Sequence, residues 1–338
     1  MAKILVTGGA GYIGSHTAVD LINNGHNVIT VDNHHNAYEA SIDHIEKITG
    51  QRPLHYKVDL CDSVATRGIF SAHPDIDAVI HFAALKAVGE STEKPLLYFE
   101  NNIKSLLNVI SGARSIGTHN LIFSSSCTVY GQATDLPVTE ETLMKEAESP
   151  YGRTKQLGEY MLKDLAQYSD LKVISLRYFN PAGAHHSGLL GEASKQKALN
   201  LVPVITETAA GKRKECVVFG DDYDTRDGSC VRDYIHIEDL AAAHTCAVQY
   251  QLNQKTRDPY EVFNLGIGDG VTVLEAIKAF EEISNQKLNY RIGPRRSGDV
   301  IAIYSNYEKA KAVLGWEPKY GIKEIMNTAW QWENNRPF

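Results

Sequence analysis

The chain has 338 residues, of which 43% are hydrophobic and 22% charged, and its formal net charge at pH 7 is −7. This composition argues against a disordered chain, and the acidic balance argues against nucleic acid as a partner, because a phosphate backbone selects for a basic surface. No stretch approaches the ~20 apolar residues of a membrane span, so we expect no membrane partner. The N-terminus lacks a signal-peptide pattern and the five cysteines form no CxxC pair, so we expect a reduced, cytoplasmic protein without a metal site.

The first half of the chain alternates short β-branched runs with helical stretches. The expected strands cover residues 4–7, 28–31, 54–58, 78–82, 121–124 and 173–176. The expected helices include residues 13–24, residues 98–116 and a helix that begins near residue 151. Strands that alternate with helices predict right-handed βαβ units, and therefore an α/β fold with a doubly wound parallel (Rossmann) sheet.

The pattern changes past residue 178, where the loops lengthen and the helices and strands become shorter. We therefore expect two domains: residues 1–177 form the sheet domain, and residues 178–338 form a smaller C-terminal domain. Residues 233–250 have the pattern of a helix. The chain is thus expected to re-enter the first domain near residues 233–265.

Three glycines follow the first strand and open the first helix, at Gly8, Gly11 and Gly14. In a dinucleotide fingerprint, the first glycine permits a tight turn, the second lets the backbone approach a pyrophosphate, and the third lets the helix pack on the strand. The helix N-terminus then offers free N–H groups to the phosphates. The pattern predicts a dinucleotide site that includes Tyr12 and Ile13.

The second strand ends in Asp32 and Asn33, roughly 20 residues past the glycines. A carboxylate at this place accepts hydrogen bonds from both hydroxyls of an adenosine ribose and repels a 2′-phosphate, which favours NAD over NADP. Asp59 ends the third strand. It is placed either to meet the adenine edge or to cap the next helix, and the residues leave both roles open.

A helix is expected from Pro150, because Ser149 is a natural N-cap and proline suits the first helical position. Tyr151 and Lys155 are then four residues apart on one face. An ammonium and a cationic nicotinamide near the phenol favour the phenolate, so we expect a lowered pKa for Tyr151. The fifth strand ends in three serines, and we assign the third, Ser126, as the hydroxyl that binds the reacting sugar oxygen.

With these motifs the chain resembles the extended short-chain dehydrogenase/reductase family, and within it the UDP-galactose 4-epimerases. The resemblance covers almost the whole length and rests on residues 8–16, 81–91, 124–131, 178–184 and 231–236. It implies an isomerase with bound NAD that interconverts UDP-galactose and UDP-glucose through a 4-keto sugar, with Tyr151 removing the proton of the 4-hydroxyl. It also implies that the first domain binds NAD and the second the UDP-sugar.

The resemblance implies further site residues and a homodimer. To the cofactor it assigns Leu60, Phe82, Ala83, Lys86, Asn101 and Tyr178. To the UDP-sugar it assigns Thr128, Asn180, Asn200, Leu201, Arg232, Arg296, Asp299 and Ile303. Arginine suits bidentate contact with a diphosphate. In the implied homodimer, helices 98–116 and 151–167 pair across a two-fold axis.

Ile303 is a departure that bears on the substrate. Some members of the family carry a tyrosine at this position, and its bulk excludes an N-acetyl group at C2 of the sugar. The smaller Ile303 leads us to expect that UDP-GalNAc and UDP-GlcNAc are also accepted. A UDP-N-acetylglucosamine 4-epimerase as the main activity is an alternative.

Two other functions remain as alternatives. A sugar-nucleotide 4,6-dehydratase needs a carboxylate pair just after Ser126, where this chain has Cys127, Thr128 and Val129. Cys127 stands where the family often has alanine, and we expect a packed thiol rather than a nucleophile. A non-catalytic NAD-sensing protein would not need Tyr151, and its presence with Lys155 and Ser126 argues against that role.

Overall fold

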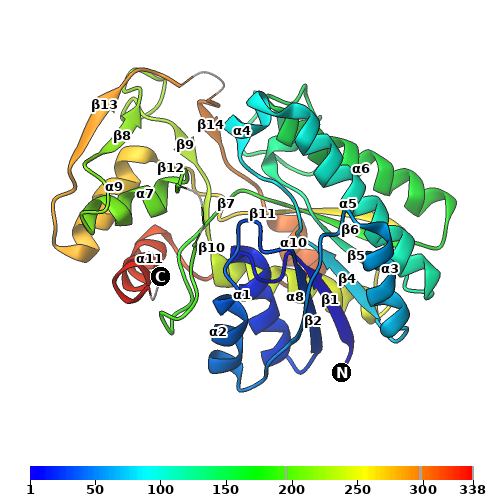
Figure 1. Cartoon of the computed structure of the whole chain (residues 1–338). Coiled ribbons are helices and arrows are strands. Elements are labelled where there is room, and N and C mark those ends of the chain that lie inside the picture. Colours follow the sequence, from blue (N-terminus) through cyan, green and yellow to red (C-terminus); the bar gives the residue numbers. More distant parts are fainter. Residues whose placement is uncertain (194, 196, 297–298, 337–338) are drawn as a thin grey trace.

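Seven parallel strands form one large sheet in a computed structural model that describes residues 1–338 except 194, 196, 297, 298, 337 and 338 (Figure 1). Their order is β11-β6-β5-β4-β1-β2-β3. The strands are β1 (Lys3–Thr7), β2 (Asn27–Asp32), β3 (Leu54–Lys57), β4 (Ala78–His81), β5 (Asn120–Ser124), β6 (Lys172–Tyr178) and β11 (Tyr260–Leu265). The prediction of an α/β fold with a doubly wound parallel sheet is confirmed.

Helices cover both faces of this sheet, which is why its central strands are almost entirely apolar. Successive strand residues point to opposite faces. Ile4 and Val6 therefore pack under one helix layer and Leu5 under the other. The first layer comprises α1 (Tyr12–Asn23), α2 (Ala40–Thr49), α8 (Ile237–Leu252) and α10 (Glu308–Leu314), and the second comprises α3 (Ser63–Ala72), α5 (Pro95–Ser115) and α6 (Pro150–Tyr168). The short helices α4 (Val88–Glu93) and η1 (Cys127–Tyr130) follow β4 and β5.

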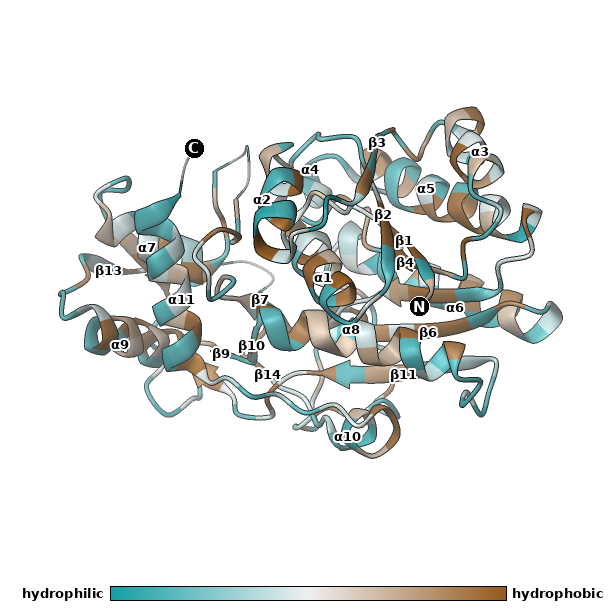
Figure 2. Ribbon diagram, turned by 90° about the horizontal axis from the view of Figure 1, so that it is seen from below, coloured by the Kyte–Doolittle hydropathy of each residue, from teal (hydrophilic) through white to brown (hydrophobic). Residues whose placement is uncertain are grey.

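A smaller unit lies to one side of the large sheet, where Figure 2 shows its helices gathered together. They are α7 (Leu201–Ala209), α9 (Val273–Ser284) and α11 (Ile322–Asn335), and they enclose a separate apolar core around Phe280 and Met326. Three small sheets join them: β7 (Asn180–Ala182) with β10 (Tyr234–His236), β8 (Cys216–Phe219) with β13 (Tyr290–Gly293), and β9 (Val231–Arg232) between β12 (Val271–Thr272) and β14 (Ala302–Ile303).

The chain returns to the large sheet after β10, where α8 packs against α1 and β11 pairs with β6. The prediction of a helix over residues 233–250 is wrong at its start, because residues 234–236 form strand β10. Helix α8 begins at Ile237, where the imidazole of His236 accepts the N–H of Glu238. The buried carboxylate of Asp233 accepts backbone N–H groups from the loops after β11 and β14, which hold this residue outside the helix.

No helix within the described ranges is long and apolar enough to cross a membrane.

Helices α3 and α5 approach closely at Gly112, where an added Cβ would lie 2.2 Å from the ring of Phe70. We expect Gly112→Ala to lower the free energy of unfolding by about 1–3 kcal/mol, as overpacking of a core does. Gly68→Ala on α3 is the matched control, because its Cβ would meet no atom within 4 Å. It should be neutral or stabilise by up to about 1 kcal/mol, since alanine favours helix. Urea unfolding measures both, and equal midpoints would contradict the close contact.

Candidate active site

The residues predicted for the cofactor and for catalysis lie at one edge of the large sheet. The sheet order places β4 on the opposite side of β1 from β2, so the direction of winding reverses at β1. In open α/β sheets, ligands bind outside the carboxyl ends of the strands at this point. These ends carry Gly8 after β1, Asp32 on β2, Phe82 after β4, Ser126 after β5 and Tyr178 on β6.

The turn between β1 and α1 has the shape that a dinucleotide requires. Gly8 has φ 68°, and a Cβ on Gly14 would lie 2.3 Å from the carbonyl oxygen of Gly8. The helix therefore starts directly against the turn, with no room for a side chain. Gly11 is the N-cap and supplies no side-chain hydrogen bond, which leaves the first-turn N–H groups for a ligand. A glycine turn of this shape beside a helix N-terminus fits a pyrophosphate.

Asp32 is held rigidly beside this turn. Its Oδ1 accepts the N–H of His34 at 2.8 Å, and its Oδ2 accepts the N–H of Ala10 at 3.2 Å. A carboxylate oxygen has two lone pairs, so each oxygen keeps one acceptor site for a hydroxyl group. This geometry suits a ribose with two free hydroxyls.

Asp59 joins this end of the site, because Asn33 Nδ2 donates to its Oδ2 at 3.4 Å. The alternative role of Asp59 as a helix cap is wrong. The chain makes a further turn after β3, and Asp62 caps α3 by accepting N–H groups of that helix. Leu60 is buried in the core between the sheet and α3.

Helix α6 begins as expected, with Ser149 Oγ accepting the N–H of Gly152 at 3.1 Å and proline in the first turn. Tyr151 and Lys155 are both buried on the face that packs toward β5. Lys155 Nζ donates to the carbonyl oxygen of Ser124 at 2.6 Å and lies 5.9 Å from the centroid of the Tyr151 ring. The structure thus brings the predicted pair to the end of β5.

The protein chain alone does not lower the pKa of Tyr151, so the expected lowering, which also invoked a cationic nicotinamide, stays a prediction for the protein with its cofactor. Burial raises the pKa of Tyr151 well above its usual value, and a hydrogen bond with Ser126 offsets only part of this effect. Burial also lowers the pKa of Lys155 to about 8, so its ammonium is present at neutral pH. Desolvation disfavours the charged form of each group, and here it outweighs their mutual attraction. A phenolate at Tyr151 therefore needs more positive charge than Lys155 supplies.

Four of the residues predicted for the UDP-sugar, Arg232, Arg296, Asp299 and Ile303, lie close together in the smaller unit. Arg232 Nη2 and Arg296 Nη2 lie 3.4 and 2.7 Å from Asp299 Oδ1. Ile303 pairs in register with Arg232 across β14 and β9, and packs in a small core with Cys127. The hydroxyl of Thr128 is buried without a hydrogen-bond partner, which is consistent with a ligand at this place.

Cys127 is a packed thiol, as expected. Its side chain is buried, and burial raises the pKa of the thiol to about 12. A thiol in this state is not a nucleophile at neutral pH, because the thiolate is the reactive form.

The remaining predicted residues are spread around this edge. Lys86 and Asn200 both donate to Glu192 Oε1, at 3.1 and 2.7 Å. Asn101 donates to its neighbour Asn102, and Asn180 lies on β7 beside β10. The Tyr12 hydroxyl donates to the carbonyl oxygen of Gly183, and the Ala83 N–H donates to the Thr7 hydroxyl. The ring of Phe82 packs on His244, and the Tyr178 hydroxyl shares a hydrogen bond with Ser124. Leu201 is the first residue of α7.

Sequence reasoning missed two carboxylates that contact these residues. Glu159 is four residues after Lys155 on the same helix face, so helical periodicity could have found it. Glu192 contacts Lys86, which is 106 residues earlier in the chain, and no local sequence pattern predicts a contact between residues so far apart.

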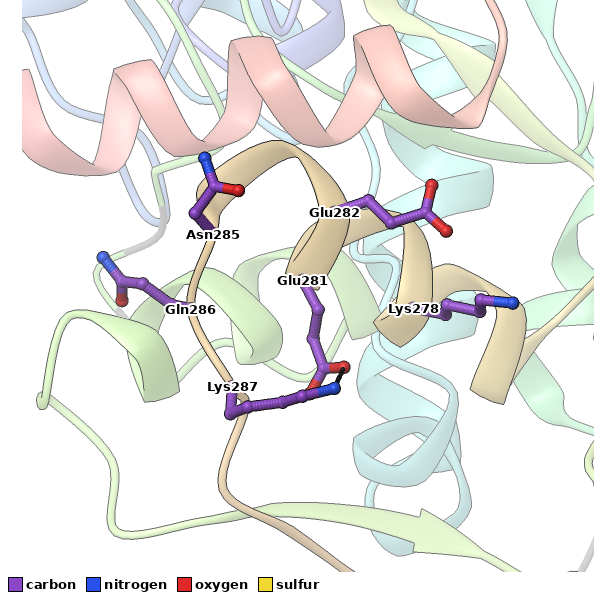
Figure 3. A pocket seen from close by; sticks show the side chains of 6 residues that line it. All are labelled: Lys278, Glu281, Glu282, Asn285, Gln286 and Lys287. Atoms are coloured by element: carbon purple, nitrogen blue, oxygen red, sulfur yellow. Dashed lines mark hydrogen bonds and ion pairs between the residues drawn. The ribbon is translucent and has the colours of Figure 1, made fainter.

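One hollow in the described part of the chain lies away from this edge. It measures about 330 Å³ and lies at the C-terminal end of α9 (Figure 3). Its lining residues are Lys278, Glu281, Glu282, Asn285, Gln286 and Lys287. The pair Glu281–Lys287 is on the surface, with the lysine side chain 90% exposed. The hollow contains none of the predicted site residues and no buried polar group that would bind a ligand.

Known proteins resemble the chain over nearly all of its length. Residues 5–329 match the family model described as GDP-mannose 4,6 dehydratase. The UDP-glucose 4-epimerase of Erwinia amylovora is 45% identical over 336 residues, which are 99% of this chain and 98% of that protein.

Two solved structures have the same fold. The UDP-glucose 4-epimerase of Bifidobacterium longum, in complex with NAD+ and UDP, superposes with a TM-score of 0.95 at 42% identity, over 99% of both chains. The UDP-Glc/GlcNAc 4-epimerase of Campylobacter jejuni has a TM-score of 0.84 at 36% identity, over 99% of this chain and 100% of that one.

Proposed function

This chain belongs to the UDP-glucose 4-epimerases of the extended short-chain dehydrogenase/reductase family, and from that membership we propose that it is an isomerase that interconverts UDP-galactose and UDP-glucose with bound NAD. The observation that carries the proposal is the meeting of Tyr151, Lys155 and Ser126 at the end of β5. This group adjoins a glycine turn that fits a dinucleotide. We assign NAD binding to residues 1–177, with re-entry near 233–265, and the UDP-sugar to residues 178–338.

Epimerisation at C4 needs a group that moves a proton while a hydride moves. Bound NAD+ supplies the acceptor, and then the donor, of the C4 hydride. Tyr151 takes the proton of the 4-hydroxyl as the C–H bond breaks, which leaves a 4-keto sugar. It returns the proton when the hydride comes back to the opposite face. Ser126 holds the 4-oxygen, since its hydroxyl already hydrogen-bonds Tyr151.

The positive charges near Tyr151 make this proton transfer feasible. Burial disfavours the phenolate, so a base at this place depends on neighbouring cations. The Lys155 ammonium is one cation, and the oxidised nicotinamide ring of bound NAD+ would be the other. We infer that Tyr151 becomes a base only when the cofactor is bound.

The nucleotide must stay bound while the sugar turns, because the hydride leaves from one face of the sugar and returns to the other. Arg232 and Arg296 are suited to this task because a guanidinium makes bidentate contacts with phosphate oxygens. Asp299 pairs with both and holds them in place. Asn180, Asn200 and Thr128 are proposed to bind the ribose and sugar hydroxyls.

The dehydratase alternative is not supported, although the matching family model carries a dehydratase description. Elimination of water from the sugar needs a second acid–base group beside C5. The positions after Ser126 hold Cys127 and Thr128, and neither is an acid at neutral pH. Burial keeps the Cys127 thiol protonated, with a pKa raised to about 12.

We propose N-acetylated sugars as additional substrates. Ile303 is the register partner of Arg232, and it packs in one apolar cluster with Cys127, the residue after Ser126. The branched aliphatic side chain of Ile303 has a smaller volume than a tyrosine side chain at the same position would have. The Campylobacter jejuni relative is described as acting on both UDP-Glc and UDP-GlcNAc.

We also propose that the protein is a homodimer formed through α5 and α6. These helices pack side by side on the far side of the sheet from the smaller unit (Figure 1). Their outer faces expose large apolar side chains at helical spacing: Leu96 and Leu107 on α5, and Leu157, Tyr160 and Tyr168 on α6. Apolar side chains concentrated on one face are typical of a protein interface.

Tyr151→Phe tests the reaction. We expect a loss of turnover of about 10²-fold or more, because general acid–base groups contribute about that factor. Cofactor content and thermal stability should stay near those of the unchanged protein. Tyr168→Phe, on the exposed end of the same helix, is the control and should be fully active. An NAD-sensing protein would lose nothing on the first substitution.

Ile303→Tyr tests the substrate range. We expect conversion of UDP-GalNAc and UDP-GlcNAc to fall at least about 10-fold more than conversion of UDP-Gal, because the phenol fills the space for the acetamide. Ile303→Val is the control and should keep both activities. Proton NMR of each substrate pair measures the ratio. An equal fall for both pairs would contradict the idea.

Leu107→Glu tests the dimer. A charge on an exposed apolar helix face opposes association, and we expect the variant to sediment as a monomer at micromolar concentration. Val64→Glu, at a 73% exposed position on α3, is the control and should leave the oligomeric state unchanged. A dimeric Leu107→Glu protein, or a monomeric parent protein, would refute this interface.

A further inference from the structure

Helix α6 buries three polar side chains at intervals of four residues: Tyr151, Lys155 and Glu159. Residues at this spacing share one helix face. The first two belong to the proposed reaction, whereas the third has no part in it. Glu159 is only 2% exposed, and a carboxylate is almost never buried this deeply without a partner.

The Glu159 carboxylate is saturated with hydrogen bonds from three strands. Arg177 of β6 donates from Nε to Oε1 at 2.9 Å and from Nη2 to Oε2 at 2.6 Å. The Tyr260 hydroxyl of β11 donates to Oε2 at 3.1 Å. The Ser125 hydroxyl, just after β5, donates to Oε1 at 2.5 Å. The carboxylate therefore ties α6 to the ends of three neighbouring strands.

Ser125 connects this carboxylate to the proposed catalytic residues. It stands between Ser124, whose carbonyl accepts the Lys155 ammonium at 2.6 Å, and Ser126, whose hydroxyl bonds Tyr151. A displacement of Ser125 would move both of these groups. The position of the proton-transfer hydroxyls thus depends on the hydrogen bond to Glu159.

Glu159 also sets the charge around Lys155. Burial lowers the pKa of Lys155 to about 8, and among the described residues Glu159 is the one group that raises it again. Arg177 is charged and is paired with Glu159, whereas the other titratable groups that surround Lys155 are uncharged near neutral pH. Burial lowers the pKa of His81 on β4 to about 3, raises that of Tyr178 on β6 to about 12, and raises that of Tyr151 further.

We propose that Glu159 is a positioning residue for the epimerase reaction, whose carboxylate holds the end of β5 through Ser125 and places a negative charge one helical turn from Lys155. This inference rests on the proposed function. A structural role alone would not predict it, because a buried ion pair contributes little more to stability than apolar residues of the same volume. Lys155, which belongs to the proposed reaction, lies one helical turn from the Glu159 carboxylate. An ion pair of Glu159 and Arg177 that served stability alone would not need a lysine at this place.

The test is Glu159→Gln in the full-length protein with its bound cofactor. The amide keeps the size of the side chain and removes its charge. Loss of an opposite charge lowers the pKa of a cation, so we expect the alkaline limb of the kcat profile to move down by about one pH unit or more. The KM for UDP-galactose should change less than about twofold, since the substrate does not touch Glu159. An unmoved alkaline limb overturns the proposal.

Two further variants distinguish a loss of stability from the shift of the pH profile. Glu159→Gln leaves the Arg177 guanidinium buried without a charge partner, which destabilises a protein. The double variant Glu159→Gln with Arg177→Met removes both charges, and we expect its alkaline limb to be shifted as well. Glu207→Gln is the matched control, because Glu207 of α7 is also paired with an arginine, Arg213, and neither residue contacts α6 or the end of β5 in the hydrogen bonds and ion pairs of the described residues. It should lower stability without moving the pH profile.

A spectroscopic measurement keeps the proposal testable if the parent protein does not epimerise. The tyrosinate difference spectrum, taken against Tyr151→Phe, reports the ionisation of Tyr151 without turnover. We expect Glu159→Gln to raise the pH at which this signal appears, because a neutral Lys155 no longer favours the phenolate. An unchanged titration overturns the inference about Glu159. A parent protein without epimerase activity overturns the proposed function instead.

Discussion

The parallel direction of the seven strands is the constraint on which the site depends. Parallel strands place all their carboxyl ends at one edge, and the helices that follow them start there. Gly8, Asp32, Ser126 and Tyr178 are therefore brought to one place, although they are far apart in the chain. The reversal of strand order at β1 marks the place where open α/β sheets bind ligands. The glycine turn and the end of β5 both lie at this edge, as a dinucleotide and a reacting sugar would require.

Burial then decides the chemistry of the side chains at this edge. One pKa unit corresponds to about 1.4 kcal/mol, and desolvation moves Lys155 by more than one such unit. The same burial stabilises the neutral phenol of Tyr151. In the proposed reaction this keeps Tyr151 from acting as a base until a positive charge is added, which suits a step in which the 4-hydroxyl loses its proton as C4 loses its hydride. The buried pair of Glu159 and Arg177 adds a fixed charge to this balance.

The smaller unit works by a different principle. Its sheets have two or three short strands, and its binding residues are held mainly by ion pairs and loops. Asp299 joins Arg232 to Arg296, and Glu192 joins Lys86 of the first unit to Asn200 of the second. These ion pairs can break when a charged ligand competes with Asp299 for the two arginines. In the proposed function the large sheet holds the reacting groups, and the smaller unit holds the nucleotide that carries the sugar.

The sequence by itself determined the features that depend on neighbouring residues. The alternation of strands and helices, the glycine turn, the cap at Ser149 and the four-residue spacing of Tyr151 and Lys155 are local patterns, and each is present in the structure. The pKa of Tyr151, the role of Asp59 and the strand at residues 234–236 were decided by the tertiary structure. So were the contacts of Glu159 and Glu192. Desolvation and long-range pairing depend on which distant segments surround a residue, and a single sequence carries no local signal of those neighbours.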